Sequence, residues 1–221
     1  MDILQQLKPN QRRIGLTGGI ASGKTTITNY IRKHKKIPIL DADNVSRELI
    51  KPNTYVYKEI LDYFGNQIID HKNNSDKEIN RKLLRNIIFK NSESKKWIEK
   101  LLHPLIKEKM IQECSQYKNN QTLVMVIPLL FEAKFEDIWT EIWLVKCPRE
   151  LQQKRLITRD KISEKEAYET INLQLSFEEK SKLSDIILDN SDDQNKWINT
   201  IKELLRTFSY STFLQEVYLQ V

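Results

Sequence analysis

With 221 residues, 39% of them hydrophobic, and no internal repeat or low-complexity linker, the chain can fill one core, so a single domain is expected. The net charge of +6 suits phosphate-bearing ligands, but the basic residues are spread out, which argues against a nucleic-acid-binding stripe. The longest apolar run, 123–131, is too short for a membrane span, residues 1–13 lack a signal-peptide core, and Cys114 and Cys147 match no metal spacing, so we expect a cytoplasmic protein with reduced thiols.

A glycine-rich loop follows the first predicted strand. Residues 1–13 are expected to form a polar extension, and Ile14 and Leu16 indicate a short buried strand after it. Four of the chain's five glycines then fall within the nine residues 15–23. They complete the pattern Gly18-x-x-x-x-Gly23-Lys24-Thr25, which is that of a phosphate-binding loop. Residues without a Cβ let such a loop turn sharply and point its N–H groups at phosphate oxygens.

The residues after this loop support a nucleotide site. Ile27, Tyr30 and Ile31 lie at helical spacing, so strand, loop and helix follow one another as the motif requires. Lys24 would reach the β- and γ-phosphates, and the Thr25 hydroxyl would ligate Mg²⁺. The positive end of the helix dipole would face the same anion. The sequence therefore predicts a site for ATP or a similar triphosphate with Mg²⁺.

Two carboxylates follow the next predicted strand, 37–41, which completes a βαβ unit and predicts a parallel, helix-covered sheet. Asp41-Ala42-Asp43 would lie at the carboxyl end of that strand, the edge where open α/β sheets bind ligands. Either acid could accept a proton from an attacking hydroxyl or hold Mg²⁺. The alternative is that Asp43 only caps the following helix, and the residues leave this choice open.

From about residue 50 to 117 the pattern is entirely helical, and we expect a lobe that grips a second substrate. Gly65 is placed to end a first helix, and Ser75-x-x-Glu78 reads as a capping box that opens a second after the polar loop 70–75. His103-Pro104 is expected to interrupt the region, with Pro104 in the first turn of a new helix. A half-buried or capping role for His103 is as plausible as a ligand contact. The apolar faces of these helices are Val56, Ile60, Leu61 and Phe64; Ile79, Leu83, Leu84 and Ile87; and Trp97, Ile98, Leu101 and Leu102.

The last third of the chain returns to strands. Residues 122–127 and 141–146 are predicted strands, followed by a charged helical pair over 148–176. Arg155 and Arg159 are four residues apart on the first of these helices, so both could reach one anion from a mobile lid. A solvated basic face is the alternative. A strand at 185–189, a turn at Asn190-Ser191 and a closing amphipathic helix from Trp197 to Phe208 complete the prediction.

Two classes of nucleotide-binding protein do not fit. A GTPase should carry a base-reading Asn-Lys-x-Asp, but Asn195-Lys196 is followed by Trp197-Ile198. The match to the Asp-x-x-Gly motif of GTPases, Asp62-Tyr63-Phe64-Gly65, is a chance one, because it lies within a predicted helix. A motor ATPase should have a strand that ends in Asp-Glu, whereas residues 123–127 lead into Pro128. A small-molecule kinase needs a phosphate loop, a base, an acceptor lobe and an arginine lid, and each has a candidate here.

Six segments together resemble the dephospho-CoA kinase family, in family order and over nearly the whole chain: 16–25, Asp41-Ala42-Asp43, His103-Pro104, 126–132, 153–160 and 185–190. The resemblance implies transfer of the γ-phosphate of ATP to the 3′-hydroxyl of dephospho-CoA, the last step of coenzyme A synthesis. It implies an α/β, three-layer P-loop NTPase fold with a central parallel sheet, a helical acceptor-binding insertion and a helical lid. Within one domain, 1–221, the core would cover about 12–50, 118–148 and 183–221, the acceptor lobe about 51–117 and the lid about 149–178.

The resemblance also implies roles for individual residues. ATP would be held by Thr17, Gly18, Gly19, Ile20, Ala21, Ser22, Gly23, Lys24, Thr25 and Thr26, with Thr25 on Mg²⁺. Asp43 would be the base, His103, Pro104, Leu129 and Glu132 would border the acceptor, and Arg155 and Arg159 would belong to the lid. The sequence departs from the family pattern at Ala21, where Gly is frequent, and at Ser184 and Ser191, where Ala and Gly are usual.

Other readings stay open at this point. The nearest is another P-loop kinase that acts on a small metabolite or nucleotide. A nucleotide-dependent nucleic-acid-binding protein would fit the basic pI of about 9.1. A scaffold that binds ATP without catalysis is disfavoured by intact Lys24, Thr25 and Asp43. We expect a monomer or a weak homo-oligomer without nucleic-acid or membrane partners.

Overall fold

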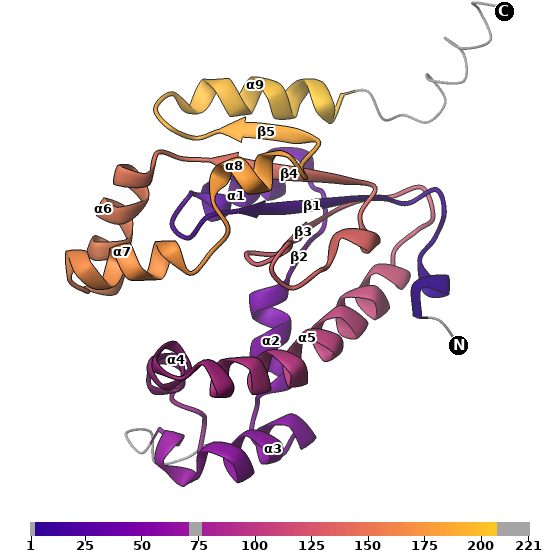
Figure 1. The fold of residues 1–221 in the computed structure, drawn as a ribbon. Helices are drawn as coiled ribbons and strands as arrows, with labels where there is room; N and C mark the ends of the chain where they lie inside the picture. Colours follow the sequence, from indigo (N-terminus) through magenta and orange to yellow (C-terminus); the bar gives the residue numbers. More distant parts are fainter. Residues whose placement is uncertain (1–2, 71–76, 207–221) are drawn as a thin grey trace, which may run out of the picture. The chain divides into compact units, whose positions relative to one another are not determined.

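The computed structural model describes residues 3–70 and 77–206. They form two compact units (Figure 1). The helical unit consists of the N-terminal residues up to Gln6 and residues 41–116, and the sheet unit begins at Leu7, leaves at Leu40 and resumes at Tyr117. In the described part of the chain, no helix combines the length and apolarity needed to cross a bilayer.

A five-stranded sheet in the order β2-β3-β1-β4-β5 organises the sheet unit. The ladders that join β3, β1, β4 and β5 are parallel, and Ile14 of β1 lies opposite Val124 of β3 and Glu141 of β4. This confirms the parallel sheet that the first βαβ unit predicts. The strands are β1 (Arg12–Gly18), β2 (Ile39–Asp41), β3 (Thr122–Val126), β4 (Glu141–Lys146) and β5 (Ile186–Asp189).

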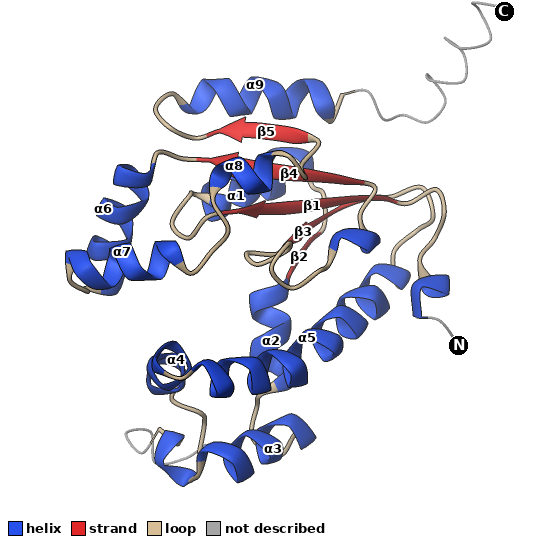
Figure 2. Cartoon of the chain, viewed as in Figure 1, coloured by secondary structure: helices blue, strands red, loops and turns tan. Residues whose placement is uncertain are grey.

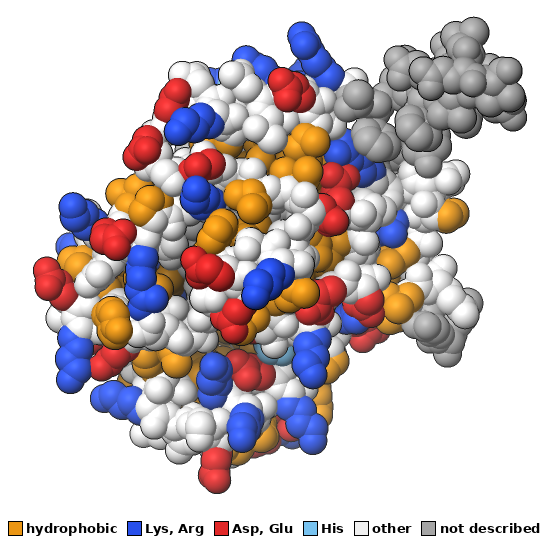
Figure 3. Space-filling model, turned by 45° about the horizontal axis from the view of Figure 1, so that its top comes forward, with side chains coloured by type: hydrophobic (Ala, Val, Ile, Leu, Met, Phe, Trp, Pro, Cys, Tyr) orange, Lys and Arg blue, Asp and Glu red, His pale blue; other side chains and the backbone are white. Residues whose placement is uncertain are grey.

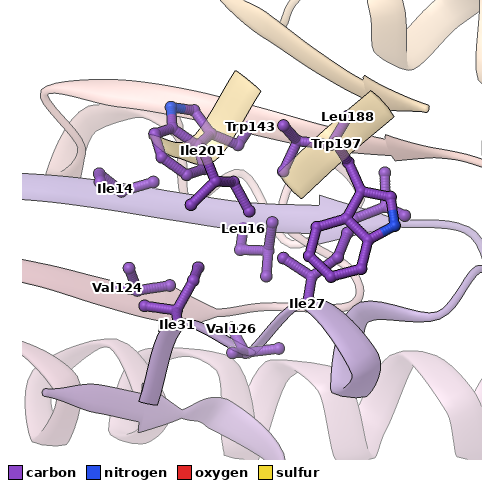
Figure 4. Packing of buried hydrophobic residues seen from close by; sticks show 11 residues of the cluster. Ile14, Leu16, Ile27, Ile31, Val124, Val126, Trp143, Leu188, Trp197 and Ile201 are labelled. Atoms are coloured by element: carbon purple, nitrogen blue, oxygen red, sulfur yellow. The ribbon is translucent and has the colours of Figure 1, made fainter. Parts of the chain in front are cut away.

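One face of this sheet packs against two helices, as the apolar periodicity predicts. Every second residue of a strand points to the same face, and Ile14 and Leu16 of β1 lie with Ile27 and Ile31 of α1 in one buried cluster (Figure 4). Trp197 and Ile201 of α9 belong to the same cluster. The helices of the sheet unit are α1 (Lys24–Lys35), η3 (Glu136–Ile138), α6 (Arg149–Asp160), α7 (Glu164–Asn172), α8 (Phe177–Ser181) and α9 (Gln194–Leu204).

The predicted helical pair after β4 is confirmed as α6 and α7, but α8 was not predicted. Its five residues are too few for a periodic signal. The helix is set by a capping box, in which the Ser176 hydroxyl accepts from the Glu179 N–H while the Glu179 carboxylate accepts from the Ser176 N–H. The closing helix α9 ends at Leu204, and Phe208 and residues 209–221 lie outside the described residues.

The helical unit has its own core, formed by Val56, Ile60, Phe64, Ile68, Ile79, Leu84 and Ile98. Gly65 ends α3 as predicted, since it has φ of 77° and its N–H donates to the carbonyl of Leu61 at 2.8 Å. The elements of this unit are η1 (Ile3–Gln6), α2 (Ala42–Leu49), α3 (Tyr55–Phe64), η2 (Asn66–Ile68), α4 (Arg81–Lys90) and α5 (Ser92–Ser115).

The capping box expected at Ser75-x-x-Glu78 does not open α4. That helix begins at Arg81, and its N-cap is Asn80, whose Oδ1 accepts from the N–H of Leu83 at 3.0 Å. Ile79 precedes the helix and forms a β-bridge with Ile69, although it is buried as its apolar character predicts. Ser75 and most of the predicted loop 70–75 lie outside the described residues.

The expected break at His103-Pro104 is wrong, because α5 runs without interruption from Ser92 to Ser115. Pro104 is inside the helix, where it removes one backbone hydrogen bond and crowds the preceding turn. Figure 2 shows α5 changing direction along its length, as proline-containing helices do. Pro104 therefore bends the helix, and His103 is helical instead of extended.

The first strand starts earlier than predicted, because Arg12 is part of β1 and is only 8% exposed. Its guanidinium donates to both carboxylate oxygens of Glu141, at 2.5 and 3.0 Å, and to the carbonyl of Leu204 at 2.9 Å. Glu141 also accepts from the indole N–H of Trp143 at 2.8 Å. The positive charge of Arg12 is therefore paired inside the fold, between β1, β4 and the end of α9. For this reason the expectation that residues 1–13 form a polar extension is wrong at its C-terminal end.

Replacing Glu141 by Ala should lower the free energy of unfolding by roughly 3–5 kcal/mol, because it leaves the buried Arg12 guanidinium without its counter-charge. Urea denaturation measures the loss. Lys146→Ala is the control in the same sheet, since it removes an ion pair to Asp189 whose lysine side chain is 45% exposed, and such pairs contribute at most about 1 kcal/mol. Equal losses in the two variants would contradict the stabilising role of the Arg12–Glu141 pair.

Candidate active site

The glycine-rich loop connects β1 to α1 and has little room for side chains. Gly23 has φ of 97°, and a Cβ there would collide with the side-chain nitrogen of Asn190. Ala21 has φ of 58°, in the left-handed region that glycine adopts at no cost and that strains other residues by about 1–2 kcal/mol. Ala21 therefore holds, under strain, a backbone shape that Gly would allow freely.

The loop leaves the first turn of α1 without a side-chain cap. Gly23 is the N-cap, and it has no side chain to accept from the first helical N–H groups. Thr25 and Thr26 are exposed on this turn, and the Lys24 ammonium donates to the carbonyls of Gly18 and Gly19 at 2.8 and 3.0 Å. An uncapped helix N-terminus beside a lysine is the arrangement that binds phosphate groups.

Asn190 supports the loop from the end of β5, a role that the sequence analysis missed. Its side-chain N–H donates to the carbonyl of Ser22 at 2.8 Å, and its Oδ1 accepts from the indole N–H of Trp197 at 3.1 Å. Its backbone N–H donates to the carbonyl of Lys146. Asn190 is buried, so these bonds fix the loop against β5 and α9. The signal available in the sequence was an asparagine directly after the last strand.

The segment after β4 also reaches the loop. A Cβ on Gly19 would lie 2.6 Å from the amide oxygen of Gln152 in α6, so this side chain lies directly over the glycine. The Arg155 Nη1 lies 3.5 Å from the carbonyls of Ala21 and Ser22 and 3.4 Å from the sulfur of Cys147. Burial raises the pKa of Cys147, although the charge of Arg155 acts in the opposite direction.

The two arginines expected to share an anion lie in different surroundings. Arg155 is half-buried beside the loop, whereas Arg159 is exposed and donates from two nitrogens to the carboxylate of adjacent Asp160, at 2.7 and 2.9 Å. A spacing of four residues therefore did not give them the same partners. The structure brings Arg155 to the phosphate loop.

The two acids at the junction of β2 and α2 differ in their contacts and in their exposure. Asp41 is the N-cap of α2, and its Oδ1 accepts from the N–H of Asp43 at 2.9 Å. Burial raises the pKa of Asp41 above its usual value. The alternative that Asp43 only caps the helix is thus wrong, because Asp41 holds that position and Asp43 is exposed in the first turn.

The residues expected to border the acceptor occur in both units. In the helical unit, His103 is half-buried, which lowers its pKa, and Pro104 is exposed. In the sheet unit, Leu129 and Glu132 lie in the loop after β3. The Glu132 carboxylate lies 2.9 Å from the Lys180 ammonium and accepts from the N–H of Leu175 at 3.0 Å, contacts that the sequence did not predict.

Comparison with known proteins gives one consistent family. The dephospho-CoA kinase family model matches residues 12–196. Dephospho-CoA kinases from two Prochlorococcus marinus strains, MIT 9312 and the subspecies pastoris strain CCMP1986, are 88% and 62% identical over 205 residues, which is 93% of this chain and the full length of each relative.

Two solved structures are similar to this chain in fold and sequence. A dephospho-CoA kinase from Campylobacter jejuni is 28% identical with a TM-score of 0.64, over 88% of this chain and 97% of that protein. The protein TT1252 from Thermus thermophilus is 25% identical with a TM-score of 0.74, over 90% and 99% of the two chains. The fold, a central parallel sheet with helices around a phosphate loop, is that of the P-loop kinases, as predicted. The chain belongs to the dephospho-CoA kinase family.

Proposed function

We propose that this chain transfers the γ-phosphate of ATP to the 3′-hydroxyl of dephospho-CoA, the last step of coenzyme A synthesis. Membership of the family supports the reaction. The observation that carries the residue assignment is the meeting of three groups at one loop: an uncapped helix N-terminus, the Lys24 ammonium and the Arg155 guanidinium. They supply the N–H donors and positive charges that a transferring phosphoryl group needs.

Lys24 and Arg155 stabilise the negative charge that develops on the phosphoryl oxygens during transfer. Both lie in the sheet unit and both already contact loop carbonyls, Lys24 at Gly18 and Gly19, and Arg155 at Ala21 and Ser22. ATP therefore meets cations that are already oriented by the fold, so less reorganisation is needed during reaction. Residues 17–26 hold the triphosphate. Arg159, which lies on α6 together with Arg155, contributes a further positive charge.

Asp43 acts as the general base. It accepts the proton of the 3′-hydroxyl as that oxygen attacks the γ-phosphorus. Because Asp41 provides the helix cap, Asp43 has no capping bond to break when it binds a hydroxyl. Asp43 is exposed, as a group that meets an incoming substrate must be.

The residues fit Mg²⁺ held chiefly by the phosphates of ATP. Among the described residues, no group of three or more His, Cys, Asp or Glu side chains could form an all-protein metal site. Mg²⁺ commonly keeps several waters and takes few protein ligands. Thr25 offers its exposed hydroxyl in the first turn of α1 for this purpose. Bound there, Mg²⁺ would supply positive charge that offsets the negative charge of the phosphates.

The remaining assignments rest on the family resemblance. His103, Pro104, Leu129 and Glu132 contribute to binding dephospho-CoA, and segment 149–178 acts as a lid. The chain works in the cytoplasm as a monomer or weak homo-oligomer, without nucleic acid. Basic and acidic side chains are interspersed on the face drawn in Figure 3, and they do not form a continuous basic stripe there.

The acceptor is tested by incubating the enzyme with ATP, Mg²⁺ and a panel of acceptors: dephospho-CoA, pantetheine phosphate, adenosine, AMP and shikimate. We expect ADP release and 3′-phosphorylated product with dephospho-CoA, at a kcat/KM at least about a hundredfold above that of any other acceptor, because a site built for hydrogen bonds rejects analogues that lack them. Equal turnover of a nucleotide or metabolite would favour the rival kinase reading. Salt-dependent binding to DNA or RNA in the same preparation would favour the nucleic-acid reading.

Replacing Asp43 by Asn should leave the Kd for ATP nearly unchanged and lower kcat about a hundredfold or more, because the base is removed without altering side-chain volume. Asp41→Asn is the matched control two residues away, since Asn caps helices about as well as Asp. Steady-state kinetics and calorimetric titration of ATP compare the two. If Asp41→Asn lost more turnover than Asp43→Asn, the roles of the two acids would have to be exchanged.

The arginines are compared through Arg155→Met and Arg159→Met. We expect kcat to fall by about a hundred- to a thousandfold for Arg155→Met, the range for removing a group that stabilises transition-state charge. The loss for Arg159→Met should be at least about tenfold smaller, because its side chain is directed to Asp160. Rapid-quench measurement of the chemical step separates this effect from product release. Equal losses would show that both arginines serve the phosphate.

A further inference from the structure

Gln174 makes a hydrogen bond to the phosphate loop that neither the sequence analysis nor the proposed mechanism uses. It lies between α7 and α8, and its Oε1 accepts from the backbone N–H of Ile20 at 2.7 Å. This bond joins positions 154 residues apart in the chain. It occupies one of the few main-chain donors in a loop whose other supports come from Asn190 and Arg155.

The position of Gln174 is fixed by its neighbours on both sides. Its own N–H donates to the carbonyl of Ile171 at 3.2 Å, at the end of α7. The next N–H, that of Leu175, donates to Glu132, and Glu132 is paired at 2.9 Å with Lys180, which is 1% exposed. An ion pair with one partner so deeply buried is held strongly in place, because separating it would leave a charge inside the protein. These contacts therefore anchor the segment that carries the amide oxygen of Gln174 to Glu132, in the loop after β3.

The loop needs such a support before nucleotide arrives. Ala21, next to Ile20, is in a strained left-handed conformation, and the glycines around it restrict the main chain very little. Ordering a residue costs about 1–2 kcal/mol of conformational entropy, and a loop that is ordered beforehand does not incur this loss when it binds. Satisfying the Ile20 N–H also removes the penalty for an unpaired donor in a half-buried site.

We propose that Gln174 is a positioning residue for ATP: it holds the phosphate loop in its binding conformation and ties that loop to the segment between α7 and α8. The opposite role, in which the amide oxygen stands in for a phosphate oxygen and must be displaced, is less favoured by the geometry. Anions are drawn to the uncapped start of α1 at Lys24 and Thr25, and Ile20 lies outside this helix, three residues before its N-cap Gly23. The two roles predict opposite changes in ATP affinity.

The test uses Gln174→Met in the full chain, which keeps the length of the side chain and removes the acceptor oxygen. We expect the Kd for ATP to rise about three- to tenfold, the loss expected for one hydrogen bond, with kcat changed by less than about twofold and the KM for dephospho-CoA unchanged. Amide hydrogen exchange at Ile20, measured by NMR without nucleotide, should become faster. Gln112→Met is the matched control, since Gln112 is half-buried like Gln174, lies on α5 in the helical unit, and its amide donates to Glu108 one turn away.

A tighter Kd for ATP in Gln174→Met would overturn the proposal in favour of displacement, and an unchanged Kd with unchanged Ile20 exchange would overturn it outright. Thermal unfolding without nucleotide checks that the variant is folded. Gln174→Glu is a second variant that retains an acceptor oxygen, so slow exchange at Ile20 should persist in it. Loss of that protection in Gln174→Glu as well would show that the hydrogen bond does not hold the loop.

Discussion

The close approach between the phosphate loop and the residues around it is the constraint on which the sheet unit depends. Gly23 has no space for a Cβ because Asn190 lies against it, and Gly19 is covered by Gln152. These contacts bring the ends of β1, β4 and β5 and the start of α6 to one short stretch of main chain. N–H groups that are kept for an anion cannot also hold the loop together, so side-chain amides and an arginine from outside the loop help to hold it in place.

Much of this arrangement could be predicted because its signals are local. The phosphate loop is a motif of consecutive residues, and strands and helices around it, such as β1, follow from apolar spacing. The end of α3 follows from a single residue, Gly65. Two of the failures came from residues that departed from the usual behaviour of their type. Proline is usually a boundary, but in α5 the rest of a 24-residue helix outweighs one lost hydrogen bond at Pro104. A charged residue usually marks solvent, but Arg12 has Glu141 as a partner far along the chain.

The supporting residues of the site could not be found from sequence for the same reason. Asn190, Gln152 and Gln174 are ordinary polar residues, and each matters only because folding places it against a loop more than a hundred residues away. Asp41 and Asp43 show the converse. The spacing of the two acids indicated chemistry but could not tell them apart, and only the structure shows that Asp41 caps α2.

The pair formed by Lys180 and Glu132 limits how this protein can change over evolutionary time. Lys180 is enclosed, and losing Glu132 alone would strand its positive charge, just as losing Lys180 would leave a carboxylate facing little water. A single substitution at either position therefore destabilises the protein, and the pair can be replaced by two neutral residues only if both positions change together. Descendants of this chain should consequently keep both residues or neither. The connection between α7 and α8 is constrained in the same way, because the N–H of Leu175 donates to Glu132.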